Sequence, residues 1–233
     1  EQIIQSFPAA IQTMLDPADC GPACISLSQD IQGQTFDYPE EFFKEKIHAI
    51  RRPRPDEFQI KEAAEKIKSS KNPIIISGGG VFYSDAMEDL SNFAIKHNIP
   101  VTQTVMGYST MKRDHSHFAG QIGALGGKNT NSLAKQTDLA IAVGTKLGDF
   151  TTGSWANFEN ENFKLVSINV SRFDANKHLA QAVVGDAKVS LNDLSQALGD
   201  WKSGEEWNKK SQVELKVWNL SLIHISEPTR RLI

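Results

Sequence analysis

Apolar and polar residues follow two different periods along the chain, and the change between them predicts the order of its elements. Apolar side chains recur every three or four positions over residues 2–15, which predicts an amphipathic helix. Residues 21–33 then show a short apolar alternation, which predicts a strand. The segment 51–56, RRPRPD, combines two prolines with four charged residues, so we expect an exposed junction between two domains there.

After this junction the pattern becomes regular. Asp56 is a good N-cap for a helix, and the continuous apolar run 73–77 predicts a strand that is covered on both faces. We expect Ser84 to cap the next helix, which should end near Asn98. One apolar face of the first of these helices would hold Ile60, Ala63, Ala64 and Ile67.

The pattern predicts three more strands and a closing helix. The strands are expected over 99–104, 138–144 and 164–170, and the helix over 187–198, with Asp186 as its cap. Strands that alternate with helices indicate parallel neighbours, because parallel strands need crossover connections. The predicted fold class is therefore α/β, a doubly wound parallel sheet with helices on both faces.

Composition narrows the class of protein without changing this prediction. The chain has 233 residues, 39% of them hydrophobic, and a formal net charge of -3, so nothing indicates nucleic-acid binding. Its longest apolar runs are far shorter than the roughly 20 residues that span a bilayer, so no membrane association is expected. Cys20 and Cys24 have neither redox-motif nor zinc-site spacing, and we expect buried reduced thiols in a cytoplasmic protein.

Ligands of open α/β sheets bind at the carboxyl ends of the strands, so the loops there are the candidate site. Consecutive glycines allow a backbone to approach an anion closely. A dinucleotide fingerprint is incomplete, because Tyr83 stands where its third glycine belongs and no acidic residue follows the next strand. Both a bound nucleotide and a tight structural turn stay open. The candidate contacts are Gly78, Gly79, Gly80, Gly144, Thr145 and Lys146.

Other polar residues give weaker indications. His115 and His117 lie on one side of a short segment, but no third ligand stands at a fixed spacing, so metal binding is not favoured. His97 and His178 are expected to be packing or surface residues. No nucleophile elbow is present, so the sequence offers no serine triad.

Several unusual stretches carry a family resemblance: PADCGPACISLSQDIQG, SGGGVFYSDA, VGTKLGDFTTGSW and NVSRFDANKH. With the loops in this order, the chain resembles the thiamine-diphosphate-dependent enzymes of the acetolactate synthase type. The longest likenesses favour a hydrolase branch that opens a cyclic dione in inositol catabolism. The alternative is the middle domain of an acetolactate synthase-like transferase with a flavin site, in which the six candidate residues would contact FAD.

The resemblance implies a division into domains. Residues 1–50 would be the end of the pyrimidine-binding domain, itself α/β, with a linker; 51–200 the middle domain; and 201–220 a linker toward a diphosphate-binding domain. Thiamine diphosphate and Mg²⁺ would then be bound mainly outside this chain, FAD is not expected, and no catalytic or metal-binding residue is assigned here. The resemblance further implies a homo-oligomeric parent, with this fragment inactive and structural.

The last residues resemble something other than protein sequence. Residues 221–233, SLIHISEPTRRLI, are similar to the translation of an adapter used in transposase-based sequencing libraries. We expect them to be non-native and to continue no helix, since Pro228 breaks any.

Overall fold

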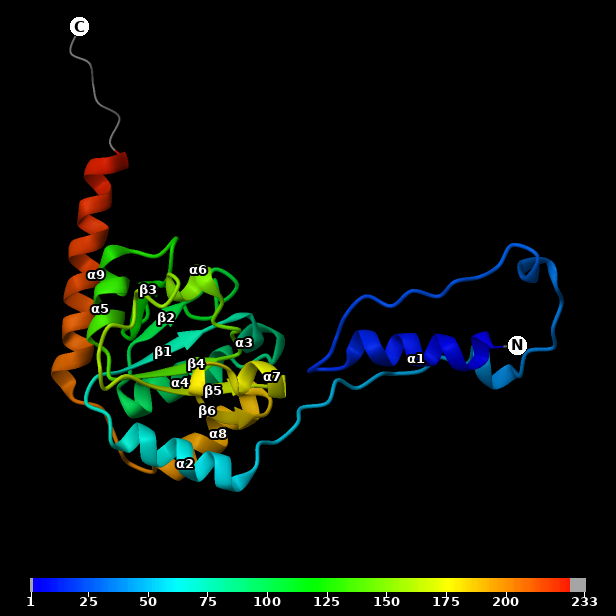
Figure 1. Cartoon of the computed structure of the whole chain (residues 1–233), viewed down its shortest axis with the longest axis horizontal. Helices are drawn as coiled ribbons and strands as arrows, with labels where there is room; N and C mark the ends of the chain where they lie inside the picture. Colours follow the sequence, from blue (N-terminus) through cyan, green and yellow to red (C-terminus); the bar gives the residue numbers. More distant parts are fainter. Residues whose placement is uncertain (1, 227–233) are drawn as a thin grey trace, which may run out of the picture. The chain divides into compact units, whose positions relative to one another are not determined.

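A computed structural model describes residues 2–226 of the chain (Figure 1). The chain divides into two compact units, of which the first is Glu1–Arg52 and the second begins at Pro53. This division falls within the proline-rich segment 51–56. The part of the chain that the structure describes contains no helix long and apolar enough to cross a membrane.

Over residues 2–52, the first unit contains one helix and two short 3-10 turns: α1 (Ile3–Leu15), η1 (Ile31–Gly33) and η2 (Glu40–Phe43). The helix predicted over residues 2–15 is confirmed. The strand predicted within 21–33 is wrong, since a strand needs a pairing partner and the described part of this unit forms none. Cys20 and Cys24 are free, but both are exposed, which corrects the prediction that they are buried.

The second unit is built on a six-stranded sheet in the order β3-β2-β1-β4-β5-β6, and all neighbours are parallel. This confirms the predicted α/β fold with a doubly wound parallel sheet. The two edge strands, β3 and β6, were not predicted. The strands are β1 (Pro73–Ser77), β2 (Val101–Gln103), β3 (Phe118–Gln121), β4 (Leu139–Val143), β5 (Lys164–Asn169) and β6 (Gln181–Val184).

Helices cover both faces of this sheet (Figure 1). One face packs against α2 (Glu57–Lys68), α4 (Met87–His97) and α8 (Ala187–Leu198). The other face packs against α5 (Lys128–Gln136) and α9 (Glu205–Ser226). The short elements at the strand ends are α3 (Gly79–Tyr83), α6 (Asp149–Thr152), α7 (Arg172–Ala175) and η3 (Lys177–Leu179).

The central strands are buried on both faces because their side chains alternate between two apolar clusters. Ile75 of β1 and Ile141 of β4 point to the α2, α4 and α8 side, whereas Ile74 and Ala140 point to the α5 and α9 side. All four are fully buried. Continuous apolar runs such as residues 73–77 therefore form strands with no solvent-facing side, as a parallel sheet requires.

Two of the predicted helices begin at the expected caps. The Asp56 side chain accepts a hydrogen bond from the Phe58 amide at 2.8 Å, and Asp186 accepts one from the Lys188 amide at 3.0 Å. The four apolar residues predicted for the inner face of α2 are all buried. A capping residue and helical periodicity together made these helices predictable from the sequence.

The helix after β1 departs from the prediction. Ser84 closes α3 as its C-cap and does not cap the next helix, because Asp85 adopts a left-handed conformation with φ of 53° and interrupts the helix. The following helix, α4, begins after Ala86 without a side-chain cap. Its predicted end is confirmed, since Asn98 is the left-handed C-cap residue.

Helix α9 occupies the segment expected to be a linker. Trp207 is buried, and its indole nitrogen donates to the Pro73 carbonyl at 2.8 Å, which fastens α9 to the start of β1. The helix continues to Ser226, so the expectation that residues from 221 continue no helix is wrong. The rest of that segment, 227–233, lies outside the described residues, and its non-native origin stays a prediction.

Candidate functional site

The candidate site lies at the carboxyl ends of β1 and β4, where the strand order reverses and the loops of the two strands meet. Gly78 donates its amide to the Val143 carbonyl and Gly80 donates to the Gly144 carbonyl, both at 2.9 Å. The structure therefore brings the two predicted glycine loops together. It also shows that two backbone amides of the first loop already donate to carbonyl groups, one at the end of β4 and one in the second loop.

The contact between these loops requires glycine on both sides. A Cβ atom on Gly78 would lie 2.4 Å from the Gly144 carbonyl oxygen and 2.5 Å from Thr145 Cβ. One on Gly80 would lie 2.6 Å from Gly144 Cα, and Gly144 itself has φ of 60°. The triple glycine thus permits backbone to pack on backbone. Gly79 approaches a third loop, with its hypothetical Cβ 3.2 Å from the Met106 carbonyl oxygen.

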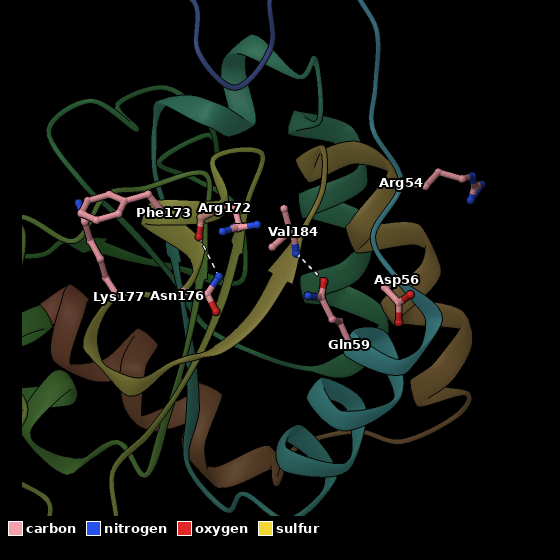
Figure 2. Close-up of a pocket in the computed structure, with 8 residues that line it drawn as sticks. All are labelled: Arg54, Asp56, Gln59, Arg172, Phe173, Asn176, Lys177 and Val184. Atoms are coloured by element: carbon pink, nitrogen blue, oxygen red, sulfur yellow. Dashed lines mark hydrogen bonds between the residues drawn. The ribbon is translucent and has the colours of Figure 1, made fainter.

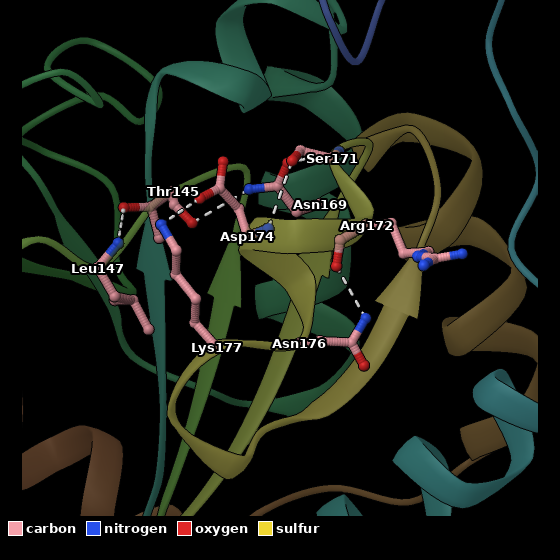
Figure 3. Close-up of polar contacts among 8 residues, drawn as sticks. All are labelled: Thr145, Leu147, Asn169, Ser171, Arg172, Asp174, Asn176 and Lys177. Carbon is pink, nitrogen blue, oxygen red and sulfur yellow. Dashed lines mark hydrogen bonds and ion pairs between the residues drawn. The ribbon is translucent and has the colours of Figure 1, made fainter.

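Thr145 and Lys146 differ in their surroundings. Thr145 is buried, its hydroxyl oxygen accepts from the Leu147 amide at 3.3 Å, and its carbonyl accepts from the Asn169 side chain at 3.2 Å (Figure 3). Lys146 is exposed at the same edge of the sheet. Of the six predicted contact residues, Lys146 is the one with a charged side chain free of the loop packing.

A hollow of about 890 Å³ lies at the same edge of the sheet as the glycine loops, at the carboxyl ends of β5 and β6 (Figure 2). It is lined by residues from the start of α2 and from the loop after β5. The Gln59 side chain accepts from the Val184 amide at 2.9 Å (Figure 2). The lining residues are Arg54, Asp56, Gln59, Arg172, Phe173, Asn176, Lys177 and Val184.

The loop after β5 is held in shape by its own polar side chains (Figure 3). Asn169 accepts from the Ser171 amide at 3.0 Å, and the Ser171 hydroxyl accepts from the Asp174 amide at 3.3 Å. The Asp174 carboxylate, largely buried, pairs with Lys177 at 2.5 Å. Asp174 and Lys177 therefore satisfy one another and shape the loop.

This loop is among the strand-end loops that the sequence marks as the candidate site, but none of its residues was predicted as a contact. The available signal for Arg172 and Lys177 was two cations within eight residues of the end of a strand. Gln59 and Arg54 gave no comparable signal, because they lie in and before a helix more than a hundred residues away in the sequence. The packing of α2 against β6 brings Gln59 to this place, and the pairing of β6 with β5 puts the loop after β5 beside it.

The histidines are engaged within the fold. His115 shares a hydrogen bond of 2.8 Å with Ser91, and His117 shares one of 3.2 Å with Asn98. Burial lowers the pKa of both imidazoles. The fully buried His97 contacts the Trp201 carbonyl oxygen at 2.7 Å, and burial lowers its pKa too.

The donor set for a metal ion is poor. Within residues 2–226, no three His, Cys, Asp or Glu side chains are grouped so that they could hold a metal ion. Asp186, which follows Gly185 at a strand end, accepts from two backbone amides as the cap of α8. The carboxylates near the hollow thus serve helices and loops.

Comparison with known proteins gives one family and a consistent set of relatives. The family described as thiamine pyrophosphate enzyme, central domain, matches residues 60–194. A protein of Clostridium perfringens (strain 13 / Type A) named 3D-(3,5/4)-trihydroxycyclohexane-1,2-dione hydrolase is 43% identical over 198 residues, which cover 85% of this chain and 31% of that protein.

Two further relatives carry the same name. The protein of Bacillus velezensis is 41% identical over 219 residues, covering 92% of this chain and 34% of its own length. The protein of Geobacillus thermodenitrificans is 40% identical over 224 residues, covering 95% and 34%. This chain therefore spans about a third of the length of the curated relatives it matches.

Proposed function

From the fact that this chain belongs to the thiamine pyrophosphate enzyme family and contains its central domain, we propose that it is part of a hydrolase acting on 3D-(3,5/4)-trihydroxycyclohexane-1,2-dione. The observation that carries the proposal is the identity to hydrolases of that name along most of the chain. The whole protein would open the ring of the dione by cleaving a C–C bond next to a carbonyl, as a step of inositol catabolism.

The described residues do not fit the cofactor of this chemistry. Thiamine diphosphate supplies an electron sink when it is bound. In the enzymes that this chain resembles, its diphosphate is held through Mg²⁺. The amides of Gly78 and Gly80 already donate to backbone carbonyls, and no group of metal ligands is found within residues 2–226. We therefore assign the cofactor, Mg²⁺ and the catalytic residues to parts of the longer protein outside this chain.

The role that remains for this chain is that of a scaffold. In the first unit, every described side chain is at least partly exposed, including large apolar ones such as Phe7, Met14 and Ile47. Exposed apolar side chains in this number are typical of a segment that packs against other parts of a protein. This supports residues 1–50 as the end of a pyrimidine-binding domain with its linker.

The flavin-containing transferase receives less support from the geometry. A flavin diphosphate at the switch point would need free amides and space between the two glycine loops. Instead, Gly78 and Gly80 lie in direct backbone contact with Gly144. We propose that these six loop residues join the strand ends and bind no FAD. The free thiols of Cys20 and Cys24 support a cytoplasmic protein, which we expect to be a homo-oligomer in its complete form.

The complete protein that contains this chain provides the test. With thiamine diphosphate and Mg²⁺ it should consume the trihydroxycyclohexanedione, form no acetolactate from pyruvate, and purify without flavin absorbance. Acetolactate formation together with bound flavin would favour the transferase. Absence of both activities in a folded, cofactor-loaded protein would refute the assignment to either enzyme.

A further inference from the structure

The loops that leave the first five strands all expose large apolar side chains. Near the strand ends, eight such side chains are each more than half exposed: Phe82, Tyr83, Val105, Met106, Tyr108, Leu125, Phe150 and Phe173. One from each loop illustrates the pattern: Tyr83 after β1, Met106 after β2, Leu125 after β3, Phe150 after β4 and Phe173 after β5. We call these five loops and their exposed apolar residues the carboxyl-edge surface.

These loops form one surface. Their strands are consecutive in the sheet, β3-β2-β1-β4-β5, so five strand ends span about 19 Å at the usual strand spacing. Contacts between neighbouring loops tie them together: Gly79 abuts Met106, the Ala124 amide donates to the Phe150 carbonyl at 2.7 Å, and the Thr145 carbonyl accepts from the Asn169 side chain at 3.2 Å. The apolar side chains therefore stand on a preformed support.

The opposite edge of the sheet differs in character. In the three residues that precede each of these five strands, all of them described, no large apolar side chain is exposed. Ile99 is fully buried there, and Phe163 packs against the core. Exposed apolar side chains are thus concentrated at the carboxyl edge, and at the opposite edge Leu179, two residues before β6, is the exception.

The amount of exposed apolar area is large for a surface left in water. At about 100 Å² for each of the eight side chains, the carboxyl-edge surface presents roughly 800 Å². The largest apolar patch of a typical monomer is about 300–600 Å². The value matches the roughly 800 Å² that each partner contributes to a stable protein interface.

We propose that the carboxyl-edge surface packs against the folded part of the longer protein that lies outside this chain. This inference rests on the proposed function only in taking the chain as part of a longer protein. The relatives are about three times as long as the matched segment, so a length of chain about twice that of this one is available to cover the surface. Burial of such a surface contributes to stability without any further ordering of the loops.

Site-specific photo-crosslinking in the complete protein tests this contact. A benzophenone side chain would be introduced by Met106→p-benzoylphenylalanine or Phe150→p-benzoylphenylalanine, and crosslinked peptides identified by mass spectrometry. Ile95, half exposed on α4 and away from this edge, gives the matched control position. We expect crosslinks from positions 106 and 150 to peptides outside residues 1–233, and none from position 95.

Two outcomes would overturn the proposal: crosslinks from both positions only to residues 1–233 of the same or a second copy, or no crosslinks in a protein whose circular dichroism matches the wild type. Ring-opening activity measured on the same samples separates this inference from the proposed function. Crosslinks without activity would leave the interface standing and refute the hydrolase, whereas activity without crosslinks would do the reverse.

Discussion

Replacing Gly78 by alanine tests the contact between the two glycine loops. Gly78 has φ of -113° and ψ of -174°, an extended conformation that alanine adopts without strain, so the effect of Gly78→Ala is steric alone. The added methyl group would stand 2.4 Å from the Gly144 carbonyl oxygen and 2.8 Å from Thr145 Cα. Both are backbone atoms of a neighbouring loop, so no flexible side chain can move aside.

The expected magnitude follows from this overlap. Overpacking a well-packed interior by one methyl group typically destabilises a protein by about 1–3 kcal/mol. We expect the upper end, about 3 kcal/mol, because the strand-end loops must separate to make room. Gly148→Ala is the matched control: nothing lies within 4 Å of its hypothetical Cβ, and its φ of -69° suits alanine. The control should lie within about 0.5 kcal/mol of wild type or be slightly more stable.

Urea unfolding followed by tryptophan fluorescence measures the difference. All four tryptophans lie in the second unit, so the signal reports the unit that contains the loops. For a domain of this size, about 3 kcal/mol also corresponds to a loss of about 6–12 °C in melting temperature. If Gly78→Ala were as stable as Gly148→Ala, the loops would not be in contact, and the switch point would have room for a ligand.

Three other predictions concern stability. Trp207→Ala should destabilise the second unit by about 3–5 kcal/mol in urea unfolding, because it removes a buried side chain; Trp207→Phe should lose about 1–2 kcal/mol, since the Pro73 carbonyl loses its donor. Burial lowers the pKa of His97, so the unfolded chain takes up this proton first, and the free energy of unfolding should fall as pH is lowered below about 6.5. The slope of unfolding free energy against pH should be shallower in His97→Gln, and an unchanged slope would refute this role. Asp56→Ala should cost about 1 kcal/mol by thermal unfolding, whereas Asp56→Asn should keep the cap.

The sequence predicted the elements whose local signals agree with their packing. Helices α2 and α8 combine a capping aspartate with helical periodicity, and β1 is a continuous apolar run between polar residues. The edge strands β3 and β6 have four residues each and no alternation, so only pairing with a neighbour identifies them. Residues 21–33 show the opposite case: their apolar alternation predicted a strand, but no neighbouring strand in the described part of the chain pairs with them.

The sequence pointed to the glycine loops at the strand ends, and the structure shows that two of these loops meet, but the function of the glycines was not decided by the sequence. Two glycine-containing loops at strand ends indicated that the backbone there closely approaches another group, either a ligand or a neighbouring loop. Whether that neighbour is a phosphate or another loop depends on Gly144 meeting Gly80, a contact between residues 64 positions apart. The hollow at β5 and β6 was missed for the same reason, since Gln59 joins it only through tertiary packing.

We propose that this chain serves as a scaffold and that the thiamine cofactor is held elsewhere in the longer protein. Calorimetric titration with thiamine diphosphate and Mg²⁺ tests it most directly, with the complete protein as the positive control. We expect binding by the complete protein and no micromolar binding by the 233-residue chain. Micromolar binding by the chain, with one cofactor per chain, would contradict it.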